Sequence, residues 1–359
     1  MPLEKQVALS DSQFFQGNYQ LLTDSLSYPE GPVYLQDGSV LLVDIKAQTL
    51  VKVSEDGTSS VIAETGGGPN GLAIGPDGCA YICNCGGFTW MPVPVPSKDQ
   101  VLQIGTTQPA DYKGGLIQKV DLQSGEVTTL YTQTSKVRRL NMQTMQWQIE
   151  TVDTPFELKG PDDIVFDELG NFWFTDWGKS RELDRDITGI YYAKADGSEI
   201  TQMVFPLNAP NGIALSPDGK RLYTVETYTG QVLYWELSAP GEIKPNPASI
   251  DGTYSLYKFG GQAIFDSMAV DSEGNLYIAT MLPYGNNPMS NGGISVVSPE
   301  GELVEYIEVI RPDGKFAPLP SNICFGGDDL KTAFITLGAS GALVKISTKI
   351  SGLKLDFNG

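Results

Sequence analysis

The chain has 359 residues and a formal net charge of −19, with 43 Asp and Glu against 24 Lys and Arg and no histidine. This negative balance argues against nucleic acid and anionic membranes as partners, because both require a positively charged face. The lack of histidine excludes Ser-His-Asp and Cys-His catalysis and zinc sites built on imidazole, so catalysis would need carboxylates, amides, lysine, tyrosine or a metal held by oxygen.

The N-terminus shows no basic region followed by an apolar run, and no stretch of about 20 apolar residues occurs that could span a bilayer. A cytoplasmic protein without membrane contact, either monomeric or homodimeric, is therefore expected. The first recognisable element is an apolar strand at 19–24. In a closed circular array a lone first strand completes the last sheet, so we expect it to pair with the unit that ends near Ile346.

A repeated unit follows. In each copy a polar residue leads into a short apolar strand, and a turn glycine eight positions later leads into a second apolar strand, as in Asn211 to Gly219. Every copy begins with an oxygen-bearing side chain, and these six anchors are Glu30, Asn70, Asp162, Asn211, Asp266 and, in a degenerate copy, Asn322. Four short strands per unit, as at 31–35, 40–44, 49–53 and 59–63, make one propeller blade. The sequence therefore predicts an all-β fold, a six-bladed β-propeller of four-stranded blades closed by an N-terminal strand, as a single domain over residues 1–359.

Two insertions interrupt the repeats. The first, at about 86–113, is rich in proline and looks irregular, and its aromatic and apolar residues favour a lid or pocket rim over a surface or dimer contact. The second, at about 134–158, contains an alternating segment typical of an extra hairpin.

The innermost strands of a propeller surround its axis, so the six anchors are predicted to form a ring of oxygen donors at one end of the channel. Asn and Asp often precede a strand only because their side chains bond nearby backbone groups, and each anchor alone reads as structural. Six in register favour a site, because gathered carboxylates repel one another unless a cation neutralises them. Three carboxylates and three amides suit Ca²⁺, Mg²⁺ or Mn²⁺. A second polar set, at the ends of the second strands, is expected to serve turn hydrogen bonding: Asp44, Asn84, Asp176, Glu226, Thr280 and Thr336.

Three segments carry a family resemblance: YPEGP at 28–32, PNGIALSPDG at 210–219 and FDSMAVD at 265–271. Their order and spacing resemble the senescence-marker-protein, gluconolactonase and luciferin-regenerating-enzyme family of six-bladed propeller lactonases. The resemblance implies one divalent metal ion bound by Glu30, Asn211 and Asp266, with Asp162 and its neighbour Asp163 beside it. Ca²⁺ is the expected ion, with Mg²⁺, Mn²⁺ and Zn²⁺ as alternatives. Sugar-lactonase members carry an arginine where this chain has Gly160.

The leading hypothesis is a gluconolactonase-like, metal-dependent hydrolase that opens a lactone. The ion would bind the carbonyl oxygen, and water would attack with Asp266, or alternatively Asp162, as the base. The predicted substrate contacts are Asn70 and Asp163, together with apolar residues that make the pocket more hydrophobic than a sugar site: Trp90, Trp177, Tyr228, Met281 and Tyr284. Two alternatives remain open: a non-catalytic propeller that binds a ligand or protein around a structural metal, and a phosphotriesterase built on the same site.

Overall fold

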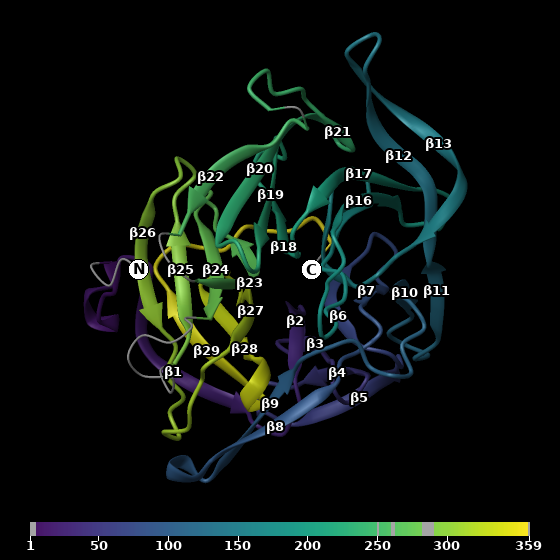
Figure 1. Ribbon diagram of the computed structural model, residues 1–359. Coiled ribbons are helices and arrows are strands. Elements are labelled where there is room, and N and C mark those ends of the chain that lie inside the picture. The colour runs from purple at the N-terminus through teal and green to yellow at the C-terminus, as the bar shows by residue number, and fades with distance from the viewer. Residues whose placement is uncertain (1–4, 250, 260–262, 282–290, 358–359) are drawn as a thin grey trace.

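The computed structural model describes residues 5–249, 251–259, 263–281 and 291–357. Regular structure in these residues is almost entirely strand, and the helical segments among them are the short 3-10 turns η2 (Leu9–Asp11), η3 (Pro96–Lys98) and η4 (Gly338–Ser340). The sheets stand in a ring around a central axis (Figure 1). The predicted six-bladed β-propeller is therefore confirmed. None of the described helical segments has the length and hydropathy needed to cross a lipid bilayer.

The first three blades contain these strands from the axis outward. Blade 1 is β2 (Pro29–Tyr34), β3 (Val40–Asp44), β4 (Thr49–Val53) and β5 (Ser59–Glu64). Blade 2 is β6 (Pro69–Ile74), β7 (Ala80–Asn84), β10 (Leu116–Val120) and β11 (Val127–Tyr131). Blade 3 is β14 (Pro161–Phe166), β15 (Asn171–Asp176), β16 (Thr188–Lys194) and β17 (Ile200–Leu207).

The other three blades follow the same plan. Blade 4 is β18 (Pro210–Leu215), β19 (Arg221–Glu226), β20 (Gln231–Ala239) and β22 (Tyr254–Lys258), with β21 (Glu242–Ile243) beside the end of β20. Blade 5 is β23 (Ile264–Val270), β24 (Leu276–Met281), β25 (Gly293–Val297) and β26 (Leu303–Glu308). Blade 6 is β27 (Pro320–Gly326), β28 (Thr332–Leu337), β29 (Ala342–Thr348) and β1 (Phe15–Thr23).

The ring is closed as the sequence predicts, because β1 pairs antiparallel with β29 and places Leu21 opposite Val344. The second strands of the blades are apolar on both faces. All five residues of β3 and of β7 are buried, since each blade is covered by a neighbour on either side. Leu41 on β3, for example, packs with Leu72 on β6 in a core shared by blades 1 and 2. Burial between blades therefore holds the ring together.

Both insertions are hairpins. The first, expected to be irregular, forms a two-stranded sheet of β8 (Trp90–Val95) and β9 (Gln100–Gly105), although Pro92 and Pro94 lie within β8. Proline is tolerated there because β8 has an unpaired edge that does not need the missing N–H donor. The second pairs β12 (Gln133–Asn141) with β13 (Gln146–Glu157), and β12 extends blade 3 by running parallel to β17.

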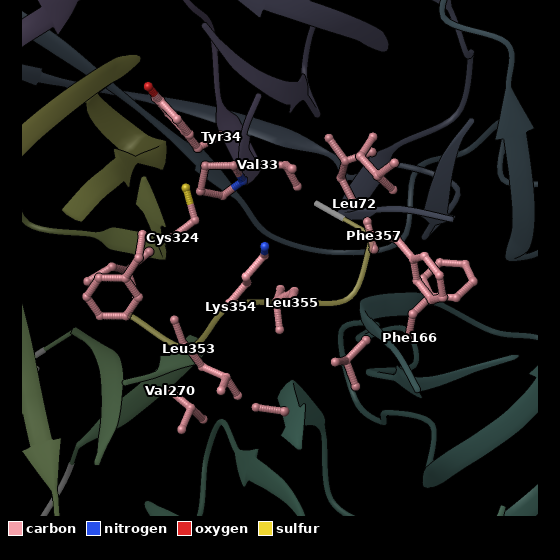
Figure 2. Close-up of a pocket in the computed structure, with 18 of the residues that line it drawn as sticks. Val33, Tyr34, Leu72, Phe166, Val270, Cys324, Leu353, Lys354, Leu355 and Phe357 are labelled. Atoms are coloured by element: carbon pink, nitrogen blue, oxygen red, sulfur yellow. The ribbon is translucent and has the colours of Figure 1, made fainter. Parts of the chain in front are cut away.

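The C-terminal segment crosses one end of the central channel. Leu353 N donates to Val270 O of blade 5 at 2.9 Å, and the ring of Phe357 meets that of Phe166 in blade 3 at 5.8 Å. Figure 2 shows Lys354 and Leu355 between these attachments. The segment and the innermost strands line a cavity of about 330 Å³.

Candidate functional site

The six anchors all lie on the innermost strands, where a local irregularity accompanies each of them. The pairing with the second strand shifts in register around the anchor, for example between Glu30 and Val33 in blade 1 and between Pro210 and Ile213 in blade 4. A β-bulge redirects the side chain that it carries. At the bulges, the polar anchors therefore do not follow the inward and outward alternation of the apolar side chains on these strands.

A glycine that follows the anchor allows neighbouring innermost strands to approach each other closely. A Cβ added to Gly71, which follows Asn70, would collide with the carbonyl oxygen of Asp162 in the next blade. A Cβ on Gly212, which follows Asn211, would lie 2.8 Å from the backbone nitrogen of Met268. Close packing between neighbouring innermost strands thus explains why glycine follows asparagine in these two blades.

Two hydrogen bonds join anchors of adjacent blades. The amide of Asn322 donates to Oε2 of Glu30 at 2.8 Å, and the amide of Asn70 donates to Oδ2 of Asp162 at 2.8 Å. Glu30 Oε2 also accepts from the backbone N–H of Gly31 at 2.5 Å. The other oxygen of Glu30, Oε1, is buried and has no hydrogen-bond partner among the described residues.

The Asn211 amide is held by residues of its own blade and the next. Its Oδ1 accepts from Ser267 Oγ at 3.3 Å, and its Nδ2 donates to Thr227 Oγ1 at 3.3 Å. Both partners are buried. Neither was expected from the sequence, although Ser267 directly follows an anchor and Thr227 directly follows the second strand of blade 4.

Asp163 has a different environment from Asp162. Its Oδ1 accepts from the backbone N–H of Ile164 at 2.9 Å, and its Oδ2 accepts from that of Ile213 at 3.4 Å. It lines the cavity that the C-terminal segment borders. Burial raises its pKa to about 6. Asp163 therefore links blades 3 and 4 on the channel side of the ring.

The acidic anchors are electrostatically strained. Burial, and then the negative charge of Asp266, raise the pKa of Glu30 well above its ordinary value. Burial raises the pKa of Asp162 in the same way, with the charges of Asp266 and Glu30 adding to the effect. Burial also raises the pKa of Asp266 to about 7, against an opposing interaction with the Asn211 amide. The charges of three blades therefore act on one another across the axis.

These residues offer oxygen donors of the kind that a hard divalent cation prefers. The unpartnered Glu30 Oε1 is a buried oxygen that a cation would satisfy, and a positive charge would relieve the mutual repulsion of the carboxylates. The described residues contain no group of three or more Asp, Glu, Cys or His side chains arranged to hold a metal ion. A cation at the ring would therefore need the Asn211 amide in addition to Glu30 and Asp266.

The second polar set serves backbone hydrogen bonding, as predicted. The Asp44 carboxylate accepts from the N–H groups of Ser27 and Tyr28 at 2.6 and 2.9 Å, just before the Glu30 anchor. The Asp176 carboxylate accepts from Lys159 N and Gly160 N, both at 2.7 Å, just before the Asp162 anchor. Each of these side chains fixes the segment that enters an anchor strand.

Four aromatic side chains contact one another in series. The ring of Phe88 lies 5.9 Å from that of Trp90 and 6.1 Å from that of Trp177, whose own ring lies 5.9 Å from that of Tyr228. Trp177 Nε1 donates to Thr227 Oγ1 at 3.0 Å, and Thr227 also bonds Asn211. The structure thus connects three predicted rim residues, Trp90, Trp177 and Tyr228, with a predicted metal ligand.

The remaining rim predictions have other outcomes. Met281 ends β24, where it is partly buried and pairs with Ile264. Tyr284 lies outside the described residues. A residue that the sequence did not single out, Lys179, is fully buried, and its Nζ donates to Gly87 O at 2.7 Å and lies 4.4 Å from the centre of the Phe88 ring. It fastens the first insertion to blade 3.

Comparison with known proteins gives consistent results. The family model described as "SMP-30/Gluconolactonase/LRE-like region" matches residues 28–339. A gluconolactonase of Zymomonas mobilis is 24% identical over 356 residues, which cover 93% of this chain and 82% of that protein. A lactonase drp35 of Staphylococcus epidermidis is 38% identical over 157 residues, which cover 43% of this chain and 43% of that protein. Among solved structures, the calcium-binding protein regucalcin of Agrobacterium tumefaciens has a TM-score of 0.65 at 16% identity, over 96% of this chain and 98% of its own. At such identity the structural likeness shows the shared fold.

Proposed function

The chain belongs to the SMP-30/gluconolactonase/LRE-like family, and from that premise we propose that it is a hydrolase that opens a lactone at the anchor ring. In this proposal Glu30, Asn211 and Asp266 hold one divalent cation, and Asp162 lies beside it. The observation that carries the proposal is the buried, unpartnered Oε1 of Glu30 within a set of mutually repelling carboxylates. Such an arrangement is costly for folding alone and is typical of a functional site.

The chain's own residues supply positioning and proton transfer. When bound, a divalent cation polarises the lactone carbonyl and offsets the charge that develops on its oxygen. We assign to Asp266 the role of accepting the proton that the attacking water loses. Asn70 holds Asp162 through the bond at 2.8 Å, and we assign to it the role of orienting the substrate.

The substrate class follows from the walls of the site. The rings of Trp90, Phe88, Trp177 and Tyr228 present an aromatic surface that suits an apolar or aromatic lactone better than a polyhydroxylated one. At Gly160, a Cβ would lie 2.5 Å from Gly178 O, so this backbone has no room for the arginine that the resemblance to sugar lactonases would place there. We therefore favour a hydrophobic lactone over an aldonolactone.

Calcium is the preferred ion for the site. The anchors offer only carboxylate and amide oxygens, which suit Ca²⁺ and also Mg²⁺ or Mn²⁺, whereas Zn²⁺ favours nitrogen and sulfur ligands. The likeness to a calcium-binding regucalcin supports the same choice.

A metal-resolved activity screen tests the proposal. The full-length chain would be treated with a chelator, resupplied with Ca²⁺, Mg²⁺ or Mn²⁺, and assayed on aromatic, alkyl and sugar lactones and on a phosphotriester. We expect ring opening of the hydrophobic lactones that is lost on chelation and restored by Ca²⁺. Asp266→Ala should lower kcat by about 100-fold or more, in the range for loss of a general base, while the exposed Glu168→Gln control should retain full activity.

Each contrary result points to a specific alternative. Full activity of Asp266→Ala would remove the assigned base. A cation that raises the melting temperature of a protein that opens no lactone would indicate a binding propeller with a structural metal. Turnover of the phosphotriester alone would indicate a phosphotriesterase.

A further inference from the structure

Arg185 lies on the loop between β15 and β16 in blade 3, and its guanidinium contacts two of the aromatic rim residues. The guanidinium carbon lies 4.8 Å from the centre of the Trp177 ring and 4.6 Å from that of the Tyr228 ring. Nη2 also donates to Trp177 O at 2.8 Å, while the side chain as a whole is only partly buried. A fixed and partly accessible cation therefore lies against the aromatic surface.

A short series of contacts connects this guanidinium with the anchor ring. Trp177 directly follows β15, and its backbone N–H donates to Gly160 O at 2.8 Å, just before the anchor strand of blade 3. Its indole Nε1 donates to Thr227 Oγ1 at 3.0 Å, and the same oxygen accepts from the Asn211 amide at 3.3 Å. One indole ring and one hydroxyl thus separate Arg185 from a proposed ligand of the cation.

The positive charge of Arg185 is not compensated by the protein. Its hydrogen bonds go to two backbone carbonyl oxygens, Trp177 O at 2.8 Å and Asp186 O at 3.4 Å. The carboxylate of Asp186 is taken by Arg181, whose Nη2 donates to Oδ1 at 2.8 Å. Within the described part of the chain, no ion pair joins Arg185 to a carboxylate.

Two lysines lie along the same aromatic series with equally neutral partners. Lys46 Nζ is 5.8 Å from the centre of the Trp90 ring and donates to Gln103 Oε1 at 2.5 Å. Lys179 Nζ is 4.4 Å from the centre of the Phe88 ring and donates to a backbone carbonyl. Neither forms an ion pair with any residue that the structure describes. In a chain with 43 acidic and 24 basic residues, three such cations beside one surface create a local positive potential that attracts an anion.

We propose that the substrate is an aromatic lactone that carries a carboxylate group, and that Arg185 binds this carboxylate at the outer end of the rim; the inference rests on the proposed function. The lactone ring lies at the anchors, and the aromatic part packs on Trp177 and Tyr228. The carboxylate takes no part in ring opening. A guanidinium suits this role because its planar set of donors matches the two oxygens of a carboxylate. Lys179 is fully buried and acts only through its charge.

A pair of matched substrates tests the inference: an aryl lactone with a carboxylate substituent, and the same lactone with a carboxamide in its place. The calcium-loaded, full-length chain should have the higher kcat/KM on the carboxylate form, and added salt should reduce that preference. Arg185→Gln should lower kcat/KM on the carboxylate form by about 10- to 100-fold, mainly through KM, in the range for a lost hydrogen bond to a charged group. Activity on the carboxamide form should change by less than about twofold, which also shows that the variant is folded. Arg185→Lys keeps the charge and should recover part of the loss.

Arg221→Gln is the matched control. The guanidinium carbon of Arg221 lies 4.8 Å from the centre of the Tyr234 ring, and its Nη1 donates to Pro299 O at 3.0 Å. Arg221 is therefore also a cation that contacts a tyrosine ring and a carbonyl, but it begins β19, at the end of that strand away from Thr227. Loss of this charge should leave kcat/KM on both lactones unchanged.

A binding measurement separates this inference from the function on which it rests. The probes are 3-phenylpropanoate and 3-phenylpropanamide, neither of which contains a lactone, titrated by calorimetry into the wild type and Arg185→Gln. Binding of the carboxylate probe that requires Arg185, in a protein that opens no lactone, would overturn the proposed function and support the anion site. Equal wild-type activity on the two lactones, or an equal loss of both in Arg185→Gln, would overturn the role of Arg185 and leave the lactonase proposal in place.

Discussion

Asp266→Asn should stabilise the cation-free protein, in the direction opposite to most substitutions at a buried site. Burial raises the pKa of Asp266 from its ordinary 3.8 to about 7. Between these values the folded state binds a proton that the unfolded chain has released. Stability therefore falls as pH rises from about 4 to about 7 and stays low above that range. Asparagine has a similar shape and does not titrate, so the variant avoids this loss.

The size of the effect follows from the same shift. At 1.36 kcal/mol per pH unit, the free-energy cost of the native carboxyl is about 4 kcal/mol at pH 8. At pH 5 the folded state is already protonated, and the cost falls to about 2 kcal/mol. The variant should therefore exceed the wild type in stability by about 4 kcal/mol at pH 8 and by about 2 kcal/mol at pH 5.

Denaturant unfolding of the chelator-treated, full-length chain measures these differences at both pH values, with tryptophan fluorescence and circular dichroism as probes. Calcium should narrow this difference at pH 8. Binding to the folded state at 100 times Kd adds about 2.7 kcal/mol to the wild type, whereas Asp266→Asn has lost a ligand and should gain little. The exposed Glu168→Gln serves as the control for a carboxylate lost elsewhere.

Two results would refute the reasoning. If the variant and the wild type differ by the same free energy at pH 5 and pH 8, Asp266 does not titrate between its ordinary pKa and 7. If calcium stabilises Asp266→Asn as strongly as the wild type, Asp266 does not bind the cation.

Two further predictions concern the supports of the site. Lys179→Met removes the donor that bonds Gly87 O at 2.7 Å. Because a lost buried hydrogen bond costs about 1–3 kcal/mol, amide hydrogen exchange in 88–112 should become faster by at least about tenfold. Unchanged exchange would show that Lys179 does not fasten the insertion. Ending the chain after Gly352 removes the contact between Phe357 and Phe166. The free energy of unfolding, measured in denaturant, should fall by about 1–3 kcal/mol, and binding of an apolar dye should increase. An unchanged denaturation midpoint would show that the segment contributes no packing.

The sequence predicted the blades, and the place of the anchors on the innermost strands, because both depend on patterns within a short stretch of the chain. A polar residue, an apolar strand and a turn glycine recur within about ten residues, and the fold repeats them around an axis. The register of Asn211 before Gly219 thus sufficed to place Asn211 on an innermost strand. The closing pair of β1 and β29 followed from the geometry of a ring.

The missed features depend on contacts between segments far apart in the chain. The residues of the C-terminal segment, such as Leu353 and Phe357, belong to no repeat, and their place across the channel is set by blades 3 and 5. Lys179 reads as a surface charge in the sequence, yet the fold buries it completely and bonds its Nζ to Gly87 O of the first insertion. Prolines concealed the hairpin of that insertion because they are tolerated at an edge strand.

The carboxylates of the two polar sets differ in how their oxygens are hydrogen-bonded. Those of Asp44 and Asp176, at the ends of second strands, are satisfied by backbone N–H groups, so they strengthen the turns that they cap. The Glu30 carboxylate, at the axis, keeps one buried oxygen without a partner among the described residues, and burial raises the pKa values of both Glu30 and Asp266. A stability-driven sequence would replace the second pair by amides, as blades 2, 4 and 6 already have at this register. In the proposed function, a bound cation would turn the mutual repulsion of the acids in the alternate blades into a favourable interaction.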